Sequence, residues 1–146
     1  MIELPTLSAT RAVGLRLAAA LAPGDAVTLS GPLGAGKTAL AAAVLEGLGW
    51  AGETASPTFP IVIAYEPPAV RLPIAHVDLY RIDDPAQVAE LGLDEVRAEG
   101  VLLVEWPEHG PRFPGALALR LEPVAGDARR LTAEVPEAWG ARWPLR

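Results

Sequence analysis

One eight-residue segment restricts the fold of this 146-residue chain more than any other. Gly31–Thr38 reads GPLGAGKT and fits the pattern G-x-x-x-x-G-K-T. The apolar run Ala26–Leu29 precedes it, and the Ala- and Leu-rich stretch Lys37–Leu48 follows it. This predicts a strand, a glycine loop and a helix in that order. The order is typical of a P-loop, in which backbone N–H groups and a helix N-terminus surround a phosphate.

Each residue type in this segment has a chemical task. Gly31, Gly34 and Gly36 let the backbone turn its N–H groups toward one point, where a Cβ would obstruct a phosphate. We expect Lys37 to place its ammonium between β- and γ-phosphate oxygens, and the Thr38 hydroxyl to bind Mg²⁺. The segment therefore predicts a nucleotide site, with contacts from Gly31, Leu33, Gly34, Ala35, Gly36, Lys37, Thr38 and Ala39.

The basic residues support the assignment of Lys37. The chain has 12 of them, and Lys37 is the only lysine. A planar guanidinium is a poor substitute for a point charge inside a phosphate loop, so a lysine kept at this position favours phosphate binding. The guanine-reading motif N-K-x-D is excluded, because the chain has no asparagine and its lysine is already in the loop. GTP is therefore a disfavoured substrate.

Composition excludes several other classes of protein. The net charge is −6, and the longest basic cluster is Arg129-Arg130, which disfavours direct binding of nucleic acid. The absence of cysteine removes disulfides, thiol catalysis and cysteine metal sites. The sequence shows neither a secretory signal nor an apolar run long enough to span a membrane, so we expect a cytoplasmic protein.

Proline and glycine divide the chain into short elements at the spacing of an α/β protein. We predict a P-loop NTPase fold of the α/β class, with a mostly parallel central sheet flanked by helices and a C-terminal antiparallel hairpin. A single P-loop ATPase domain is expected over residues 1–146, with an irregular packed tail over 136–146. The predicted strands are Ala26–Leu29, Ile61–Tyr65, Leu72–Asp78, Val101–Val104, Leu117–Leu121 and Leu131–Val135; the predicted helices begin at Thr6 or Ser8, Lys37, Asp84 and Asp94.

Two acids stand at the ends of apolar strands. Asp78 closes the run IAHVD, and Glu105 closes VLLVE. The carboxyl ends of parallel strands share the sheet edge at which a P-loop opens, so at least one of these acids is expected to serve the metal. For each of them, the alternative is to cap the following turn. His76 alternates with Asp78, so their side chains are predicted to share a face.

Two further candidates have structural alternatives. Thr58, in the segment Ser56–Phe59, follows the P-loop helix at the place where switch segments sit in many P-loop hydrolases. It is expected either to contact the γ-phosphate or Mg²⁺, or to lie in an ordinary X-Pro turn. Trp106 follows Glu105 and either packs against the nucleotide site or belongs to the core.

The ordered motifs GPLGAGKT, SPTF (Ser56–Phe59), HVDLYR (His76–Arg81) and VEWPE (Val104–Glu108) resemble the TsaE family. These are bacterial P-loop ATPases of tRNA threonylcarbamoyladenosine (t6A) biosynthesis, and the likeness covers about Ser8–Glu108. The resemblance implies binding of ATP and Mg²⁺, slow ATP hydrolysis, and action with TsaD-like and TsaB-like proteins. That pair transfers a threonylcarbamoyl group to adenosine 37 of tRNA, so contact with tRNA would be indirect.

The resemblance also implies roles for single residues. Thr38 and Glu105 would be Mg²⁺ ligands, and Asp78 would act at or near the metal. Lys37, Asp78 and Glu105 are thus the expected catalytic set. Trp106 would border the nucleotide, and Arg129 is a weaker candidate for a nucleotide contact.

The chain departs from the family pattern at two positions. Pro32 stands where the family often has Asp, and Ala39 stands where a second Thr is common; neither position must supply a side chain to the phosphates. Two other functions remain open from the sequence. One is a small-molecule kinase, although no insertion resembles a lid, and the other is a nucleotide-sensing scaffold in which hydrolysis has no energetic role.

Overall fold

The computed structural model describes residues 1–54 and 61–145, and in it seven strands form one sheet. Their order is β1-β7-β6-β2-β5-β4-β3. The central strands β6, β2, β5 and β4 are parallel to one another, and the pairs β3–β4, β6–β7 and β1–β7 toward the edges are antiparallel. This confirms the predicted α/β class with a C-terminal hairpin. The bounds are β1 Ile2–Leu4, β2 Ala26–Ser30, β3 Val62–Tyr65, β4 Ile74–Asp78, β5 Val101–Glu105, β6 Leu117–Pro123 and β7 Arg129–Glu134.

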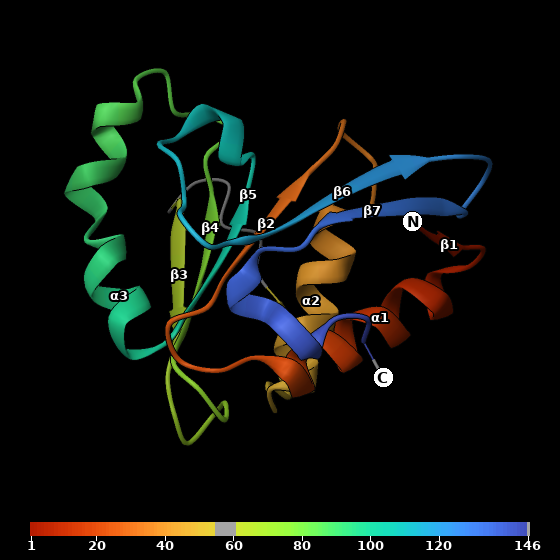
Figure 1. The fold of residues 1–146 in the computed structure, drawn as a ribbon, viewed down its shortest axis with the longest axis horizontal. Coiled ribbons are helices and arrows are strands. Elements are labelled where there is room, and N and C mark those ends of the chain that lie inside the picture. Colours follow the sequence, from red (N-terminus) through yellow and green to blue (C-terminus); the bar gives the residue numbers. More distant parts are fainter. Residues whose placement is uncertain (55–60, 146) are drawn as a thin grey trace.

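Helices cover both faces of this sheet (Figure 1). Helices α1 (Leu7–Ala20) and α2 (Lys37–Gly47) lie side by side on one face. Helix α3 (Leu93–Glu99) lies on the other, next to the 3₁₀ helix η1 (Pro85–Leu91). Alternate residues of β4 and β5 enter separate apolar clusters, so the two faces of the sheet have separate cores.

Close helix packing on the first face depends on glycine. A Cβ added at Gly14 of α1 would lie 2.4 Å from the Cβ of Ala43 in α2. One added at Gly47 of α2 would lie 2.5 Å from the Cβ of Ala18 in α1. Both distances are shorter than side chains tolerate, so the two glycines set the separation of the helices.

Two of the predicted helix starts are confirmed, and each has a side chain that caps the helix. Thr6 caps α1, and its hydroxyl accepts a hydrogen bond from Ala9 N at 3.1 Å. Asp84 caps η1: its carboxylate accepts from Ala86 N at 3.0 Å, and the side-chain oxygen of Gln87 accepts from Asp84 N at 3.4 Å. The predicted helix at this point is a 3₁₀ helix along its whole length.

The two ends of the chain differ from the expectation. Strand β1 was not predicted, and it pairs with β7 at the edge of the sheet. The tail expected to be irregular contains the 3₁₀ helix η3 (Glu137–Arg142), whose Trp139 is buried in the core. Arg142 fixes this helix to the body by pairing with Asp25 at 2.6 Å.

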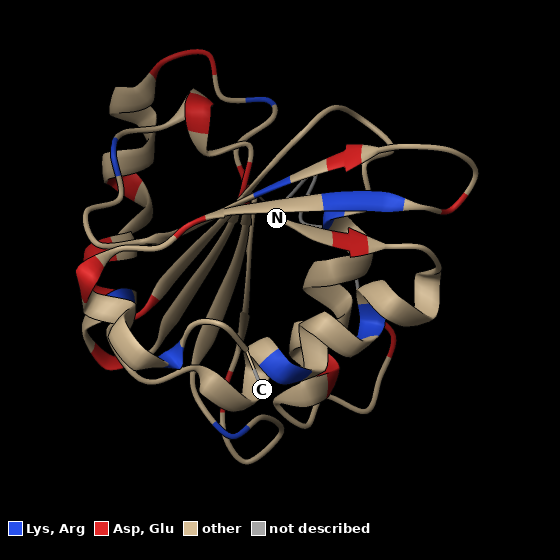
Figure 2. Ribbon diagram, turned by 45° about the vertical axis from the view of Figure 1, so that its right-hand side comes forward, with Lys and Arg blue, Asp and Glu red and all other residues tan. Residues whose placement is uncertain are grey.

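Charge is spread over the surface. In Figure 2, Asp and Glu segments lie in loops and helices on both sides of the sheet, and within the described residues Lys and Arg segments form no continuous band. None of the helices over residues 1–54 and 61–145 has the length and apolar character needed to cross a membrane.

Candidate functional site

The glycine loop, Gly31–Gly36, connects β2 to α2 at the centre of the sheet. Gly31, Gly34 and Gly36 have φ values of 137°, 78° and 97°, in the region that favours glycine. A Cβ at Gly31 would lie 2.2 Å from the carbonyl oxygen of Leu121 in β6, so the neighbouring strand already excludes a side chain there. A Cβ at Gly34 would meet nothing within 4 Å and would point into open space.

Lys37 begins α2 and is 5% exposed. Its ammonium donates hydrogen bonds to the carbonyl oxygens of Gly31 at 2.5 Å and Pro32 at 2.9 Å, and it lies 4.3 Å from the ring centroid of Trp106. Burial lowers the pKa of Lys37, and the nearby carboxylate of Glu105 opposes that shift. The one lysine of the chain is thus a buried cation inside the glycine loop.

The two strand-terminal acids lie next to each other. Asp78 of β4 is opposite Glu105 of β5 in the parallel register, on the face that α2 covers. Glu105 is 2% exposed and contacts two side chains: Oε1 accepts from the Thr38 hydroxyl at 3.2 Å, and Oε2 lies 2.6 Å from Nε2 of His76. The carboxylate therefore connects the start of α2 with the middle of β4.

Asp78 has a different environment. It is 8% exposed, and its Oδ1 accepts a hydrogen bond from Tyr80 N at 2.9 Å. Burial raises the pKa of Asp78, while the Tyr80 bond acts in the opposite direction and the charge of Glu105 adds to the rise. Asp78, beside the glycine loop, thus holds a proton more tightly than an ordinary aspartate does.

A cavity of about 450 Å³ brings the predicted site residues together. Every predicted site residue lines it except Gly31, the first residue of the loop, and Thr58, which is outside the described residues. Sequence reasoning did not assign three further residues to it: Leu7, Tyr80 and Arg81. The lining is Leu7, Leu33, Gly34, Ala35, Gly36, Lys37, Thr38, Ala39, Asp78, Tyr80, Arg81, Glu105, Trp106 and Arg129.

Two of the lining residues shape the wall of the cavity. Trp106 has a left-handed backbone (φ 58°, ψ 50°), and its ring lies 4.8 Å from that of Tyr80. Arg129 reaches from β7 and donates to the carbonyl oxygens of Gly34 at 3.0 Å, Gly126 at 2.8 Å and Ala128 at 2.9 Å. Arg129 thus braces the glycine loop, and its contact with a nucleotide stays a prediction.

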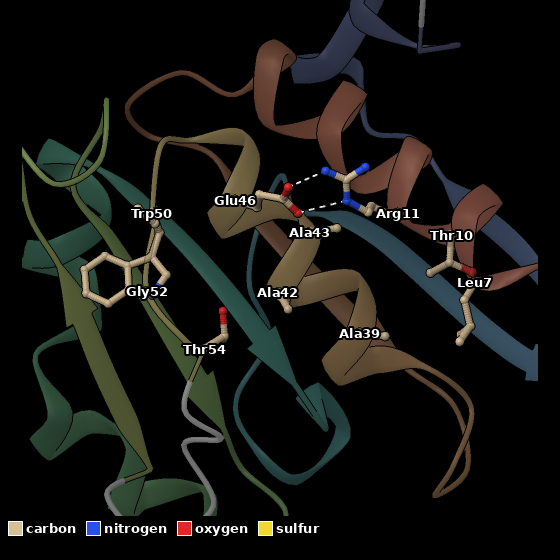
Figure 3. Close-up of a pocket in the computed structure, with 11 residues that line it drawn as sticks. Leu7, Thr10, Arg11, Ala39, Ala42, Ala43, Glu46, Trp50, Gly52 and Thr54 are labelled. Atoms are coloured by element: carbon tan, nitrogen blue, oxygen red, sulfur yellow. Dashed lines mark hydrogen bonds and ion pairs between the residues drawn. The ribbon is translucent and has the colours of Figure 1, made fainter.

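A second cavity, of about 530 Å³, lies next to the first, along α1 and α2. Leu7 and Ala39 line both cavities. Figure 3 shows the alanines of α2 between α1 on one side and Trp50 and Thr54 on the other, with the Arg11–Glu46 ion pair at one end. Thr10 lines this cavity, and its buried hydroxyl has no hydrogen-bond partner within the described residues.

The oxygen donors of the first cavity fit Mg²⁺. Within the described residues, no group of three or more His, Cys, Asp or Glu could hold a metal by itself. Mg²⁺ is, however, usually bound by one or two carboxylates together with substrate phosphates, and seldom by a cage made of protein alone. The Thr38 hydroxyl and the Glu105 carboxylate, 3.2 Å apart at the glycine loop, are the oxygen groups that could supply the protein's share of such a site.

Comparisons with known proteins agree with one another. The model of the family described as "Threonylcarbamoyl adenosine biosynthesis protein TsaE" matches residues 4–131. The tRNA threonylcarbamoyladenosine biosynthesis protein TsaE of Streptomyces coelicolor is 38% identical over 91% of this chain and 93% of its own length. The TsaE protein of Bacillus subtilis is 45% identical over 66% of this chain and 60% of its own length.

A solved structure has the same fold. The crystal structure of YdiB from Bacillus subtilis superposes with a TM-score of 0.71 and 34% sequence identity, and covers 94% of this chain and 86% of that one. The matched part of the sequence includes the glycine loop, both strand-terminal acids and Arg129. On this agreement of sequence, fold and site, the chain belongs to the TsaE family of tRNA threonylcarbamoyladenosine biosynthesis proteins.

Proposed function

We propose that this protein is a Mg²⁺-dependent ATPase that binds ATP in the first cavity and supports t6A formation. The observation that carries the proposal is the buried Lys37 ammonium inside a loop of left-handed glycines, beside the Thr38–Glu105 pair. A compact cation, inward-facing backbone N–H groups and oxygen ligands for Mg²⁺ are the parts that a triphosphate requires.

ATP has room in the two adjacent cavities. The phosphates would lie at the start of α2, where the helix N-terminus and Lys37 favour negative charge. The adenosine would extend past Leu7 and Ala39 into the second cavity, whose lining is mostly apolar and includes the buried Thr10 hydroxyl as a polar group.

Hydrolysis would proceed by in-line attack of water on the γ-phosphorus. Lys37 and the loop N–H groups stabilise the charge that develops on the phosphate oxygens, and Asp78 orients the water or supports the metal. Mg²⁺, when bound by Thr38 and Glu105, would neutralise charge on the β- and γ-phosphates. Arg129 is engaged with loop carbonyls, so we infer slow turnover that contact with a partner accelerates.

The partners we propose are a TsaD-like and a TsaB-like protein in the cytoplasm. The Streptomyces and Bacillus relatives are named as t6A biosynthesis proteins, which supports this assignment. The net charge of −6 and the lack of a continuous band of Lys and Arg segments in the described residues support indirect contact with tRNA through those partners.

Calorimetry with ATP and Mg²⁺ tests the nucleotide site. Lys37→Ala is expected to weaken ATP binding by more than about tenfold, ~1.4 kcal/mol, because it removes the only cation inside the loop. Lys37→Arg should bind with intermediate affinity, since a planar fork replaces a point charge. Arg16→Ala removes an exposed cation outside the lining of the first cavity and is the matched control.

The outcome against the proposal is wild-type affinity in Lys37→Ala, or no heat of binding in the wild type. Coupling is tested with Glu105→Gln in a reconstituted reaction with a TsaB–TsaD-type pair. Retained ATP binding with loss of t6A formation supports a coupled ATPase. Full t6A formation by this variant contradicts the proposal.

A further inference from the structure

His76 is a buried polar residue to which the proposed mechanism gives no task. It lies in the middle of β4, is fully buried, and faces the cluster beneath α2. In the parallel register His76 is opposite Leu103, and Asp78 is opposite Glu105. His76 and Glu105 are therefore diagonal neighbours on one face of the sheet, a spacing that long side chains can bridge.

The two oxygens of Glu105 have separate partners. Oε2 lies 2.6 Å from Nε2 of His76, and Oε1 accepts from Thr38 at 3.2 Å. A carboxylate held by one donor can rotate about its last torsion, whereas two donors on different elements fix its plane. The His76 imidazole thus binds Oε2, and Oε1 remains next to Thr38 at the start of α2.

The remaining nitrogen of His76 indicates the tautomer. Nδ1 is buried and has no hydrogen-bond partner within the described residues. A carboxylate oxygen accepts hydrogen bonds, so we assign the proton to Nε2 and the lone pair to Nδ1. The opposite tautomer would leave a buried N–H donor unpaired and place a lone pair against the carboxylate, and both features are costly.

We propose that His76 is a positioning residue whose Nε2–H donates to Oε2 of Glu105 and orients Oε1 toward Thr38 and the metal. This proposal rests on the proposed function, because Glu105 is taken as a Mg²⁺ ligand. Partners of metal ligands commonly contribute about 10- to 100-fold to metal affinity, because they fix the orientation of the ligand. His76 never touches nucleotide or metal, and it acts through Glu105.

The first test reads the tautomer without metal or nucleotide. Long-range ¹H–¹⁵N spectra of the full-length protein are expected to give His76 a protonated Nε2 and an unprotonated Nδ1. An unprotonated Nε2 would overturn the proposal, because a histidine without that proton cannot donate to Glu105.

The second test compares two variants. His76→Gln places an amide N–H near the position of Nε2, whereas His76→Leu fills similar space without a donor. We expect His76→Leu to weaken Mn²⁺ binding at least about tenfold in the presence of a non-hydrolysable ATP analogue, and His76→Gln to restore most of the loss. Mn²⁺ is followed by electron paramagnetic resonance, and analogue binding in EDTA by calorimetry.

A purely structural role would move both measurements together. Our proposal predicts that analogue affinity in EDTA stays within about twofold of the wild type in both variants, because the loop is unchanged. Unaltered Mn²⁺ affinity in His76→Leu, or an equal loss in EDTA, would overturn it. If the leucine variant does not fold, His76→Asn, whose amide is too short to reach Glu105, replaces it with the same expectation.

Failure of the proposed function gives a different result. A wild-type protein that binds no ATP analogue refutes the nucleotide site, while the tautomer measurement still tests the His76–Glu105 bond.

Discussion

Asp78 and Glu105 end adjacent strands and are both buried, yet their partners differ. Glu105 contacts the side chains of Thr38 and His76, whereas Asp78 has a hydrogen bond from one backbone N–H. Burial outweighs that bond and raises the pKa of Asp78. In the folded protein Asp78 thus holds its proton more tightly than an ordinary aspartate does.

This difference predicts how stability depends on pH. Asp78 binds its proton more tightly in the folded protein than in the unfolded chain. The free energy of unfolding therefore falls as the pH rises from the ordinary aspartate pKa, about 3.9, to the raised pKa of Asp78 in the folded protein. Asp78→Asn keeps an oxygen that can accept from Tyr80 and removes the ionisation. The variant should therefore be more stable than the wild type near neutral pH, by a margin that shrinks as pH falls toward about 4.

Urea unfolding at several pH values measures this effect. Asp83→Asn, which removes an exposed carboxylate, is the control and should leave the pH dependence of the wild type unchanged. The interpretation fails if Asp78→Asn lowers stability at neutral pH with the wild-type slope.

Among the helices and strands, the sequence predicted those whose position depends on neighbouring residues in the chain. The apolar run before the glycine loop formed a strand, and helices begin next to Thr6 and Asp84, two of the predicted starts. Strand β1 was missed because Ile2–Leu4 is too short for an alternation pattern to stand out, and its stability comes from pairing with β7. Tertiary pairing of this kind leaves no local signal.

At the candidate site, too, local sequence signals predicted some features, and tertiary packing determines the others. The glycine loop, both acids and the shared face of His76 and Asp78 followed from motif and alternation. The His76–Glu105 bond could not be predicted, because it depends on the register between β4 and β5, and a long connection that contains η1 and α3 separates these strands in the chain. Leu7 enters the cavity only because α1 packs on α2.

That packing provides a prediction for the helix pair. In an isolated helix Gly→Ala is stabilising by about 1 kcal/mol. Gly14→Ala is instead expected to destabilise the protein by about 1–3 kcal/mol, because the new Cβ would collide with Ala43. Chemical denaturation measures the change, and Ala19→Gly at an exposed position of α1 calibrates the propensity effect. A gain in stability for Gly14→Ala would contradict the close approach of the helices.

For the whole molecule, the C-terminal segment joins the main core. Trp139 is 1% exposed and packs in the cluster beneath α1 and α2, and the Arg142 guanidinium lies 4.1 Å from its ring centroid. The ion pair between Arg142 and Asp25 ties the same segment to the turn before β2. We therefore expect the tail and the sheet to unfold together, as a single domain would.

Trp139→Ala tests that expectation. It should cost about 3–5 kcal/mol and shift one cooperative transition, because it opens a large cavity in the shared core. Trp139→Phe should cost less, since it keeps an aromatic ring and removes an indole N–H that has no partner within the described residues. Far-ultraviolet circular dichroism and tryptophan fluorescence should give the same midpoint. Two separate transitions would show that the tail is an independent unit.

The strand beneath the glycine loop is held on both sides. Strand β2 forms parallel ladders with β5 and with β6, so it cannot tilt without breaking hydrogen bonds in both. Strand β2 therefore gives the glycine loop a rigid base. Under the proposed function, we expect motion during turnover at lining residues on other elements, such as Tyr80, Arg81 and Arg129. The proposed partner would then detect the state of the nucleotide through those residues and not through the sheet.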